Sequence, residues 1–181
     1  MISLKSKVTI KILGYYFINK DESHYVNELA KILAVDPGNL FRKLKELERE
    51  GLFVSEMKGN QRYFTLNKKC PLLSEYKNIY ESKFGLPEIL RVELKKVTGL
   101  HEAYIYGSYA KGDFSKDSDI DLLLVGSHDY SKISGIVAPL ERRFGREINI
   151  VDFSVAEFKK RRKEGDEFIK NILGGKNIQI I

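Results

Sequence analysis

Two short motifs near the middle of this 181-residue sequence could act on phosphates. Gly107-Ser108 follows one apolar run, and Asp119 and Asp121, starting eleven positions after Ser108, enter a second. Residues two apart on a strand share a face, so the two carboxylates would repel each other unless a cation lay between them. Magnesium prefers such oxygen ligands, while glycine and serine can admit and bind phosphates. The residues predict one site for Mg²⁺ and a nucleoside triphosphate.

The stretch AYIYGSYAKGDFSKDSDIDLLLVG, 103–126, resembles the signature of the minimal nucleotidyltransferases in the polymerase-beta-type superfamily. That signature joins Gly-Ser to Asp-x-Asp on a strand. An Asp-x-Asp motif alone is common, but together with Gly-Ser and the apolar strand it is specific. The resemblance implies that Asp119 and Asp121 are catalytic metal ligands and that Gly107 and Ser108 bind the nucleotide.

The third acidic position of that superfamily is not matched here. Active members usually carry another carboxylate on the strand that reads EINIVD in this sequence, and the matching residue is Asn149. An amide oxygen can bind magnesium but adds no negative charge, so it should activate an attacking hydroxyl poorly. Glu147 shares the strand face of Asn149 and could replace it, whereas Asp152 should face the other way.

The elements that would position this site alternate between strands and helices. The pattern predicts strands from Ala103 and around the two aspartates, a helix near 129–144, a strand at 148–151, a helix near 156–173 and a last strand at 178–181. This order is typical of an α/β domain with helices layered on a mixed sheet. We therefore assign residues 100–181 to a nucleotidyltransferase-fold domain.

The first third of the chain differs in charge. Residues 1–69 hold 13 Lys and Arg against 8 Asp and Glu, whereas the remainder holds 18 against 17. A local basic excess of this kind indicates contact with nucleic acid, although a solvated surface could also account for it.

The same third has a regular order of elements. Periodicity and end signals predict helices at 7–19, at 27–34 with Asn27 as a cap, and from Asp36-Pro37 to Gly51, then strands at 52–57 and 61–66 joined by Lys58-Gly59-Asn60. The segment 26–67 resembles the winged helix-turn-helix domains of bacterial and archaeal regulators. That resemblance implies contacts with double-stranded DNA by Asn39, Arg42 and Lys43 in the major groove and by Lys58 and Arg62 on phosphates. Such a domain can also dock proteins.

Residues 70–99 alternate apolar and charged positions at helical spacing and predict two connecting helices. They could cover the flanking cores or form a homodimer interface. The whole chain thus predicts an α+β two-domain protein. One cysteine, three scattered histidines and no apolar run of membrane-spanning length argue against a disulfide framework, a zinc cluster and a membrane protein, and favour the cytoplasm.

Two functions remain open from the sequence. The whole chain resembles a two-domain family of transcriptional regulators, in which the nucleotidyltransferase-like domain would bind nucleotide and Mg²⁺ as a sensor or serve as a scaffold. The unmatched third acid favours this regulator. The alternative is an active enzyme that transfers a nucleoside monophosphate to a hydroxyl of a protein or small molecule.

Overall fold

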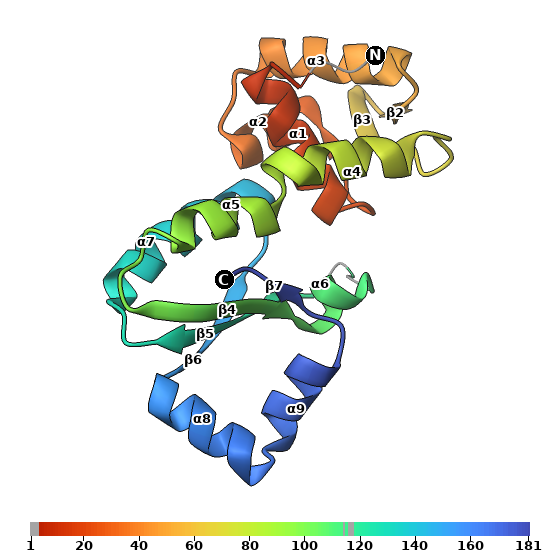
Figure 1. The fold of residues 1–181 in the computed structure, drawn as a ribbon. Coiled ribbons are helices and arrows are strands. Elements are labelled where there is room, and N and C mark those ends of the chain that lie inside the picture. Colours follow the sequence, from red (N-terminus) through yellow and green to blue (C-terminus); the bar gives the residue numbers. More distant parts are fainter. Residues whose placement is uncertain (1–3, 114, 116–117) are drawn as a thin grey trace. The chain divides into compact units, whose positions relative to one another are not determined.

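The computed structural model describes residues 4–113, 115 and 118–181. It divides the chain into two compact units, and Figure 1 labels the elements of both. The first unit comprises Met1–Gly85 with Arg142–Gly145, and the second comprises Leu86–Glu141 with Arg146–Ile181. Three residues of the 103–126 motif, Phe114, Lys116 and Asp117, lie outside the described residues. No helix among the described residues is both long and apolar enough to cross a membrane.

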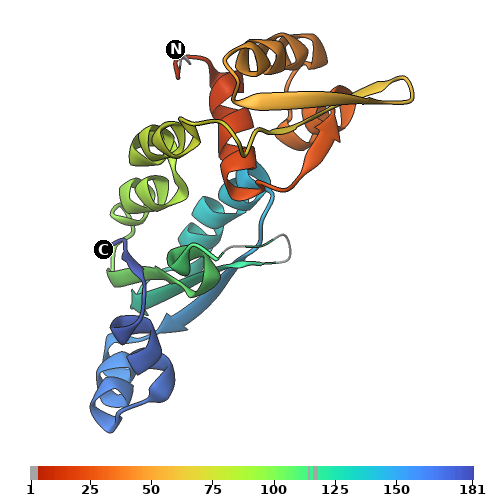
Figure 2. The same ribbon diagram turned by 90° about the vertical axis from the view of Figure 1, so that its right-hand side faces the viewer.

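The first unit contains helices and one small antiparallel sheet with strand order β1-β3-β2. Its elements are α1 (Lys7–Ile18), β1 (Ser23–Tyr25), α2 (Val26–Leu33), α3 (Pro37–Arg49), β2 (Phe53–Lys58), β3 (Gln61–Leu66) and α4 (Leu73–Phe84). The three predicted helices and the predicted hairpin are confirmed. In Figure 2 the β2–β3 hairpin extends away from the helices of this unit.

The two helix starts predicted in this unit have different outcomes. The Asp36 carboxylate accepts the backbone N–H of Asn39 at 2.8 Å and Pro37 occupies the first turn, so the predicted start of α3 is confirmed. The prediction that Asn27 caps α2 is wrong. This helix begins at Val26, directly after β1, and its cap residue Tyr25 makes no side-chain capping bond.

The sequence pattern did not predict β1. This strand has three residues, and its pairing with β3 places Ser23, His24 and Tyr25 opposite Thr65, Phe64 and Tyr63. Three residues are too few to display an alternating pattern. The strand exists because β3 offers a free edge, which is a tertiary cause.

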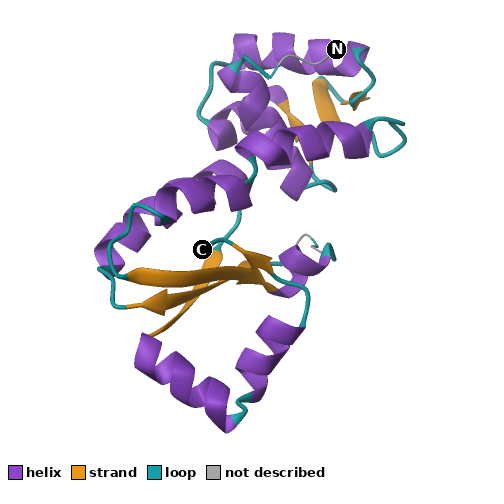
Figure 3. Cartoon of the chain, in the orientation of Figure 1, coloured by secondary structure: helices purple, strands orange, loops and turns teal. Residues whose placement is uncertain are grey.

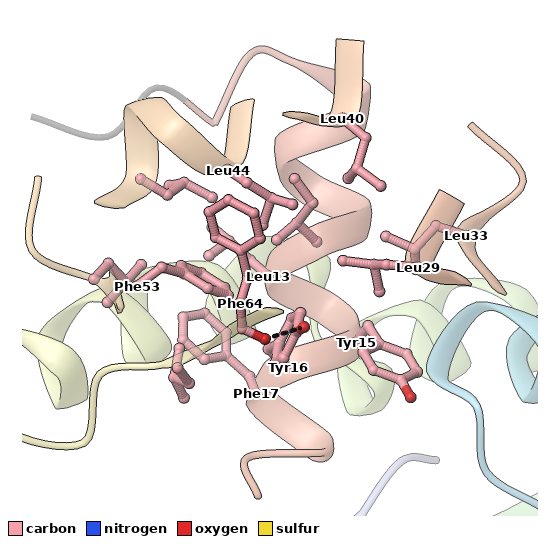
Figure 4. Close-up of a cluster of buried hydrophobic side chains, with 14 of the residues drawn as sticks. Leu13, Tyr15, Tyr16, Phe17, Leu29, Leu33, Leu40, Leu44, Phe53 and Phe64 are labelled. Atoms are coloured by element: carbon pink, nitrogen blue, oxygen red, sulfur yellow. Dashed lines mark hydrogen bonds between the residues drawn. The ribbon is translucent and has the colours of Figure 1, made fainter. Parts of the chain in front are cut away.

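The core of the first unit lies between α1, α2, α3 and the sheet (Figure 4). The apolar faces predicted for the helices are buried there, including Leu29, Leu40 and Leu44. Tyr16 is fully buried with them, and its hydroxyl donates to the carbonyl oxygen of Phe64 at 2.9 Å. This bond satisfies a polar group that would otherwise be costly to bury, and it ties α1 to β3.

The second unit is built on a four-stranded mixed sheet with strand order β6-β5-β4-β7. Its elements are α5 (Leu86–Leu94), β4 (Leu100–Tyr106), α6 (Gly107–Lys111), β5 (Ile120–Gly126), α7 (Tyr130–Phe144, whose last three residues belong to the first unit), β6 (Ile148–Phe153), α8 (Val155–Glu164), α9 (Glu167–Gly174) and β7 (Ile178–Gln179). β5 and β6 are parallel, whereas β4 is antiparallel to both β5 and β7. The predicted mixed sheet is therefore confirmed.

Two elements of this unit differ from the prediction. The glycine turn after β4 is the short helix α6, which Gly112 ends in a left-handed conformation with φ of 85°. The single helix expected near 156–173 is two helices, because Gly165 adopts a φ of 79° and Asp166 then caps a new helix by accepting the N–H of Ile169. Residues 159–167 contain no apolar side chain, so helical periodicity could not reveal the turn.

Helices cover both faces of the sheet in the second unit, as Figures 1 and 3 show. α5 and α7 lie on one face, and α8 and α9 lie on the other. Phe158, Ile169 and Ile172 from α8 and α9 pack against Leu123 and Tyr104 of the sheet. Because alternate residues of a strand share a face, these contacts determine which side chains point toward α8 and α9.

Candidate functional site

The register of three strands places two of the predicted site residues, Asp121 and Asn149, in one row. Tyr106 of β4 lies opposite Asp121 of β5, and Asp121 lies opposite Asn149 of β6. Asp121 has the same strand parity as Leu123, so it projects from the face that packs on α8 and α9. Residues far apart in the sequence thus meet at the end of β4 and the beginning of β5 and β6.

Asp119 lies beside this row, but not on the strand itself. β5 begins at Ile120, so the prediction that both aspartates lie on the strand is wrong for Asp119. The side-chain amide of Asn149 donates to the Oδ2 atom of Asp119 at 3.2 Å. The backbone N–H of Ile120 also donates to the carbonyl oxygen of Glu147 at 3.0 Å, which fixes the segment carrying Asp119 against the start of β6.

The two carboxylates form a cluster of like charge. Partial burial and the neighbouring charge of Asp119 raise the pKa of the Asp121 carboxyl above its usual range. Burial and the charge of Asp121 also raise the pKa of the Tyr106 hydroxyl. The protein therefore maintains negative charge here at an electrostatic cost, which a bound cation would relieve.

Gly107 is required by the space around Asp121. Its φ is 71°, and a Cβ at this position would lie 2.1 Å from the Oδ2 atom of Asp121. Any other residue would displace the carboxylate. Next to it, the half-buried Ser108 has no hydrogen bond from its hydroxyl to any described residue, so that hydroxyl is free for a ligand.

The structure places all three residues considered for the third acidic position. Asn149 reaches Asp119, as described above. Glu147 precedes β6 and contributes its backbone carbonyl to Ile120. Asp152 projects from the opposite face, where its Oδ2 atom lies 3.3 Å from Nε2 of His128. Of the three, the side chain shown to contact the aspartates is the neutral amide.

The donor set fits a magnesium ion in chemical type. Asp119 and Asp121 supply carboxylate oxygens, and the amide oxygen of Asn149 could complete the set after a rotation of its side chain. Within the described residues, no group of three His, Cys, Asp or Glu residues could hold a metal ion. A cation at this site would thus rely on two charged ligands rather than three.

A cluster of aromatic side chains beside the site was not predicted from the sequence. The ring of Phe168 in α9 meets Tyr106 edge to face, with centroids 5.7 Å apart, and also contacts Phe153. Phe168 remains 38% exposed. Tyr106 could have been noticed because it precedes Gly107, but no sequence signal connects residue 168 with residue 106.

The predicted DNA contacts lie on α3 and on the β2–β3 hairpin of the first unit. Arg42 is exposed and donates to Oδ1 of Asn39 at 3.0 Å. The Nζ atoms of Lys43 and Lys58 pair with carboxylates at 2.6 Å and 2.7 Å, respectively. Arg62 of the hairpin is half-buried. Lys43, predicted to contact the major groove, and Lys58, predicted to contact a phosphate, are therefore paired within the protein.

Comparisons with known proteins indicate the family of the chain. Residues 88–173 match the family described as "Polymerase beta, Nucleotidyltransferase". A protein of Methanocaldococcus jannaschii named "Putative protein adenylyltransferase" is 33% identical over 101 residues, which is 56% of this chain and 93% of that protein.

Two solved structures resemble the chain weakly. The mutant toxin-antitoxin complex MntA-HpeT aligns with a TM-score of 0.34 and 16% identity over 52% of this chain and 68% of that one. A "putative nucleotidyltransferase" from Sulfolobus solfataricus aligns with a TM-score of 0.29 and 20% identity over 51% and 73%. Scores this low add nothing to the assignment, which depends on the sequence matches. Because the archaeal relative is matched over nearly its whole length, the chain belongs to the polymerase beta-type nucleotidyltransferase family.

Proposed function

We propose that the second unit transfers a nucleoside monophosphate from a nucleoside triphosphate to a hydroxyl group of another protein. The principal support is the convergence of Asp119, Asp121 and Gly107 where β4 ends and β5 and β6 begin. The name of the archaeal relative suggests adenosine as the nucleoside and a protein as the acceptor. This reverses the preference drawn from the sequence, where the missing third acid favoured a regulator without transfer activity.

The binding step depends on Gly107 and Ser108. The missing Cβ at Gly107 lets phosphate oxygens approach the backbone next to Asp121, and the unengaged hydroxyl of Ser108 can donate to one of them. Asp119 and Asp121 would hold Mg²⁺. When bound, this ion would offset the charge of the triphosphate and of the leaving pyrophosphate.

The transfer step forms a bond between the acceptor oxygen and the α-phosphorus and breaks the bond from that phosphorus to the bridging oxygen. Pyrophosphate leaves with the bonding electrons, and the hydroxyl proton passes to solvent. Asn149 orients Asp119 through its amide but cannot accept this proton. We therefore expect slower transfer than three carboxylates would allow.

The test is label transfer by the purified full chain. With Mg²⁺ and ATP, GTP, CTP or UTP labelled at the α-phosphate, the protein should label one or more proteins of a cell extract. Replacing the metal ligands together, Asp119→Asn with Asp121→Asn, should reduce labelling at least about a hundredfold, since metal-assisted charge stabilisation is lost. The matched control is Asp129→Asn with Glu164→Gln, which removes two exposed charges elsewhere in the unit. Equal labelling by the ligand variant, or no labelling by the parent with any nucleotide, would refute the proposal.

We propose DNA binding by the first unit as a second candidate function. It is supported by the order of its elements, with α3 followed by an extended hairpin, and by the exposed guanidinium of Arg42 on α3. The affinity for duplex DNA should fall steeply with salt, because bound lysines and arginines release counterions. Arg42→Ala should weaken specific binding by about 1–3 kcal/mol if it contacts a base edge. Salt-independent binding, or an unchanged variant, would argue for a protein-docking role instead.

A further inference from the structure

α8 carries five consecutive cationic residues, 159–163, between Glu157 and Glu164. The helix packs on the sheet through Phe158, which is 2% exposed. One member of the run, Arg161, is used within the fold. It pairs with Glu157 at 2.8 Å and Asp166 at 3.6 Å and lies over the ring of Phe153.

The three lysines of this run have no such use. Lys159, Lys160 and Lys163 are exposed, and none of them has an ion-pair partner within the described part of the chain. We call these three residues the lysine face. Lys159 and Lys163 are four positions apart, so they lie on the same side of the helix, where like charges destabilise it.

Helix stability does not explain the lysine face. Cations in the last turn of a helix interact favourably with its dipole, which accounts for Arg161, Arg162 and Lys163. Lys159 and Lys160 lie before that turn, and the effect decays within one turn. The fold therefore maintains at least two lysines that contribute nothing evident to its stability.

We propose that the lysine face binds an acidic segment of the acceptor protein. The inference rests on the proposed transfer function, and it specifies the acceptor as a protein with clustered Asp or Glu near the modified hydroxyl. α8 and α9 pack on the same sheet face from which Asp121 projects. An acceptor held by α8 is thus bound on the side of the sheet where the reaction occurs, and its negative charges match the unpaired lysines.

An RNA acceptor fits the lysine face less well. Proteins that bind single-stranded RNA usually combine cations with exposed aromatic rings that stack on bases. Phe158 is buried and Arg161 covers Phe153 at 4.8 Å. The partly exposed ring of Phe168 is packed against Tyr106 and Phe153. Lysines alone offer point charges without stacking, which suits flexible carboxylates.

The experiment measures binding of a fluorescein-labelled oligoglutamate peptide to the full chain by anisotropy at low salt. The triple variant Lys159→Gln, Lys160→Gln, Lys163→Gln should weaken binding about tenfold, the sum expected for three exposed ion pairs. The matched control Lys95→Gln, Lys96→Gln, Lys132→Gln removes the same charge from exposed lysines just after α5 and in α7 and should change affinity less than about twofold. Glutamine has a helix propensity close to that of lysine, so α8 should remain folded in both, and circular dichroism checks this.

Two further measurements make the outcome decisive. The variant with both Asp119→Asn and Asp121→Asn should bind the peptide as the parent does, so a failure of the proposed catalysis is distinguishable from a failure of docking. Single-stranded RNA of equal charge should bind more weakly than the peptide. Peptide binding that is equal in the triple variant and the parent, or tighter binding of RNA that depends on the lysine face, would overturn the proposal.

Discussion

α3 and α8 are both basic helices with an exposed face, but their charges are arranged differently. On α3, Lys43 pairs with Glu46 and Lys45 pairs with Glu48, each three positions away. On α8, the lysine face has no ion-pair partners among the described residues. The basic excess counted over residues 1–69 therefore does not locate the free positive charge, because side-chain pairing neutralises much of α3.

Within the described part of the chain, the aspartate site also carries unpaired charges, in contrast to the paired charges on α3. Asp119 and Asp121 are kept close together without a basic partner in any described contact, and the pKa of Asp121 is raised. Charges that are paired within one helix can be explained by stability. Like charges that are held together are more readily explained by binding of an oppositely charged ligand, so they indicate function.

The largest effect should follow from filling the space beside the aspartates. Gly107→Ala places a Cβ 2.1 Å from a carboxylate oxygen of Asp121 at a backbone conformation unfavourable for alanine. Displacing a reacting group by about 1 Å can cost a hundredfold, so label transfer should fall by about that factor.

Gly135→Ala in α7 is the control for that substitution. Its added Cβ meets no described atom within 4 Å, and its φ is not in the left-handed region. This variant should retain activity and gain up to about 1 kcal/mol of stability, since alanine favours the helix. Equal activity of the two alanine variants would show that Gly107 is not part of the site.

A third carboxylate should produce the next largest effect. In the parent protein Asp119 accepts a hydrogen bond from the amide of Asn149, and Asn149→Asp replaces this amide with a negative charge. At saturating Mg²⁺, transfer should rise, and Mg²⁺ affinity measured by calorimetry should increase about tenfold, or ~1.4 kcal/mol. A parent that is already fast and is slowed by this change would show that the amide belongs to a complete site, and Glu147→Gln would then be assayed.

A smaller effect should follow from freeing a lysine on α3. Glu46→Gln removes the partner of Lys43, so the affinity for duplex DNA should increase a few-fold, the value of one exposed ion pair, about 0.2–1 kcal/mol. The control Glu75→Gln makes the same change in charge on α4 instead of α3. If both variants bind duplex DNA with equal affinity, Lys43 does not contact the DNA.

The smallest effect should appear in thermal unfolding. The pKa of Asp121 is raised in the folded protein above its ordinary value of 3.8. Ionising this carboxyl therefore destabilises the folded state as the pH rises from 3.8 through the raised pKa. Asp121→Asn should therefore raise Tm by roughly a few degrees at neutral pH without Mg²⁺. At a pH below 3.8, where the carboxyl is protonated in both states, the substitution should leave Tm unchanged. A variant with a lower Tm at neutral pH would contradict the electrostatic cost assigned to this site.

The sequence alone determined the elements that have strong local signals. Asp36 and Pro37 predicted the start of α3, and the apolar runs predicted β5 and β6. The Gly-Ser and Asp-x-Asp spacing also indicated the family, because phosphate and metal binding require those residue types in a fixed order. Such features depend on neighbours in the chain, so they can be read without the fold.

Other features depended on contacts between distant segments. β1 exists through its pairing with β3, and α8 and α9 separate at Gly165, within a polar stretch whose periodicity gives no signal. The contact of Asn149 with Asp119 follows from the parallel register of two strands joined by α7. Whether a lysine is paired or free is likewise a property of side-chain geometry. Local sequence states which charges are present, whereas only the tertiary structure decides which of them are neutralised.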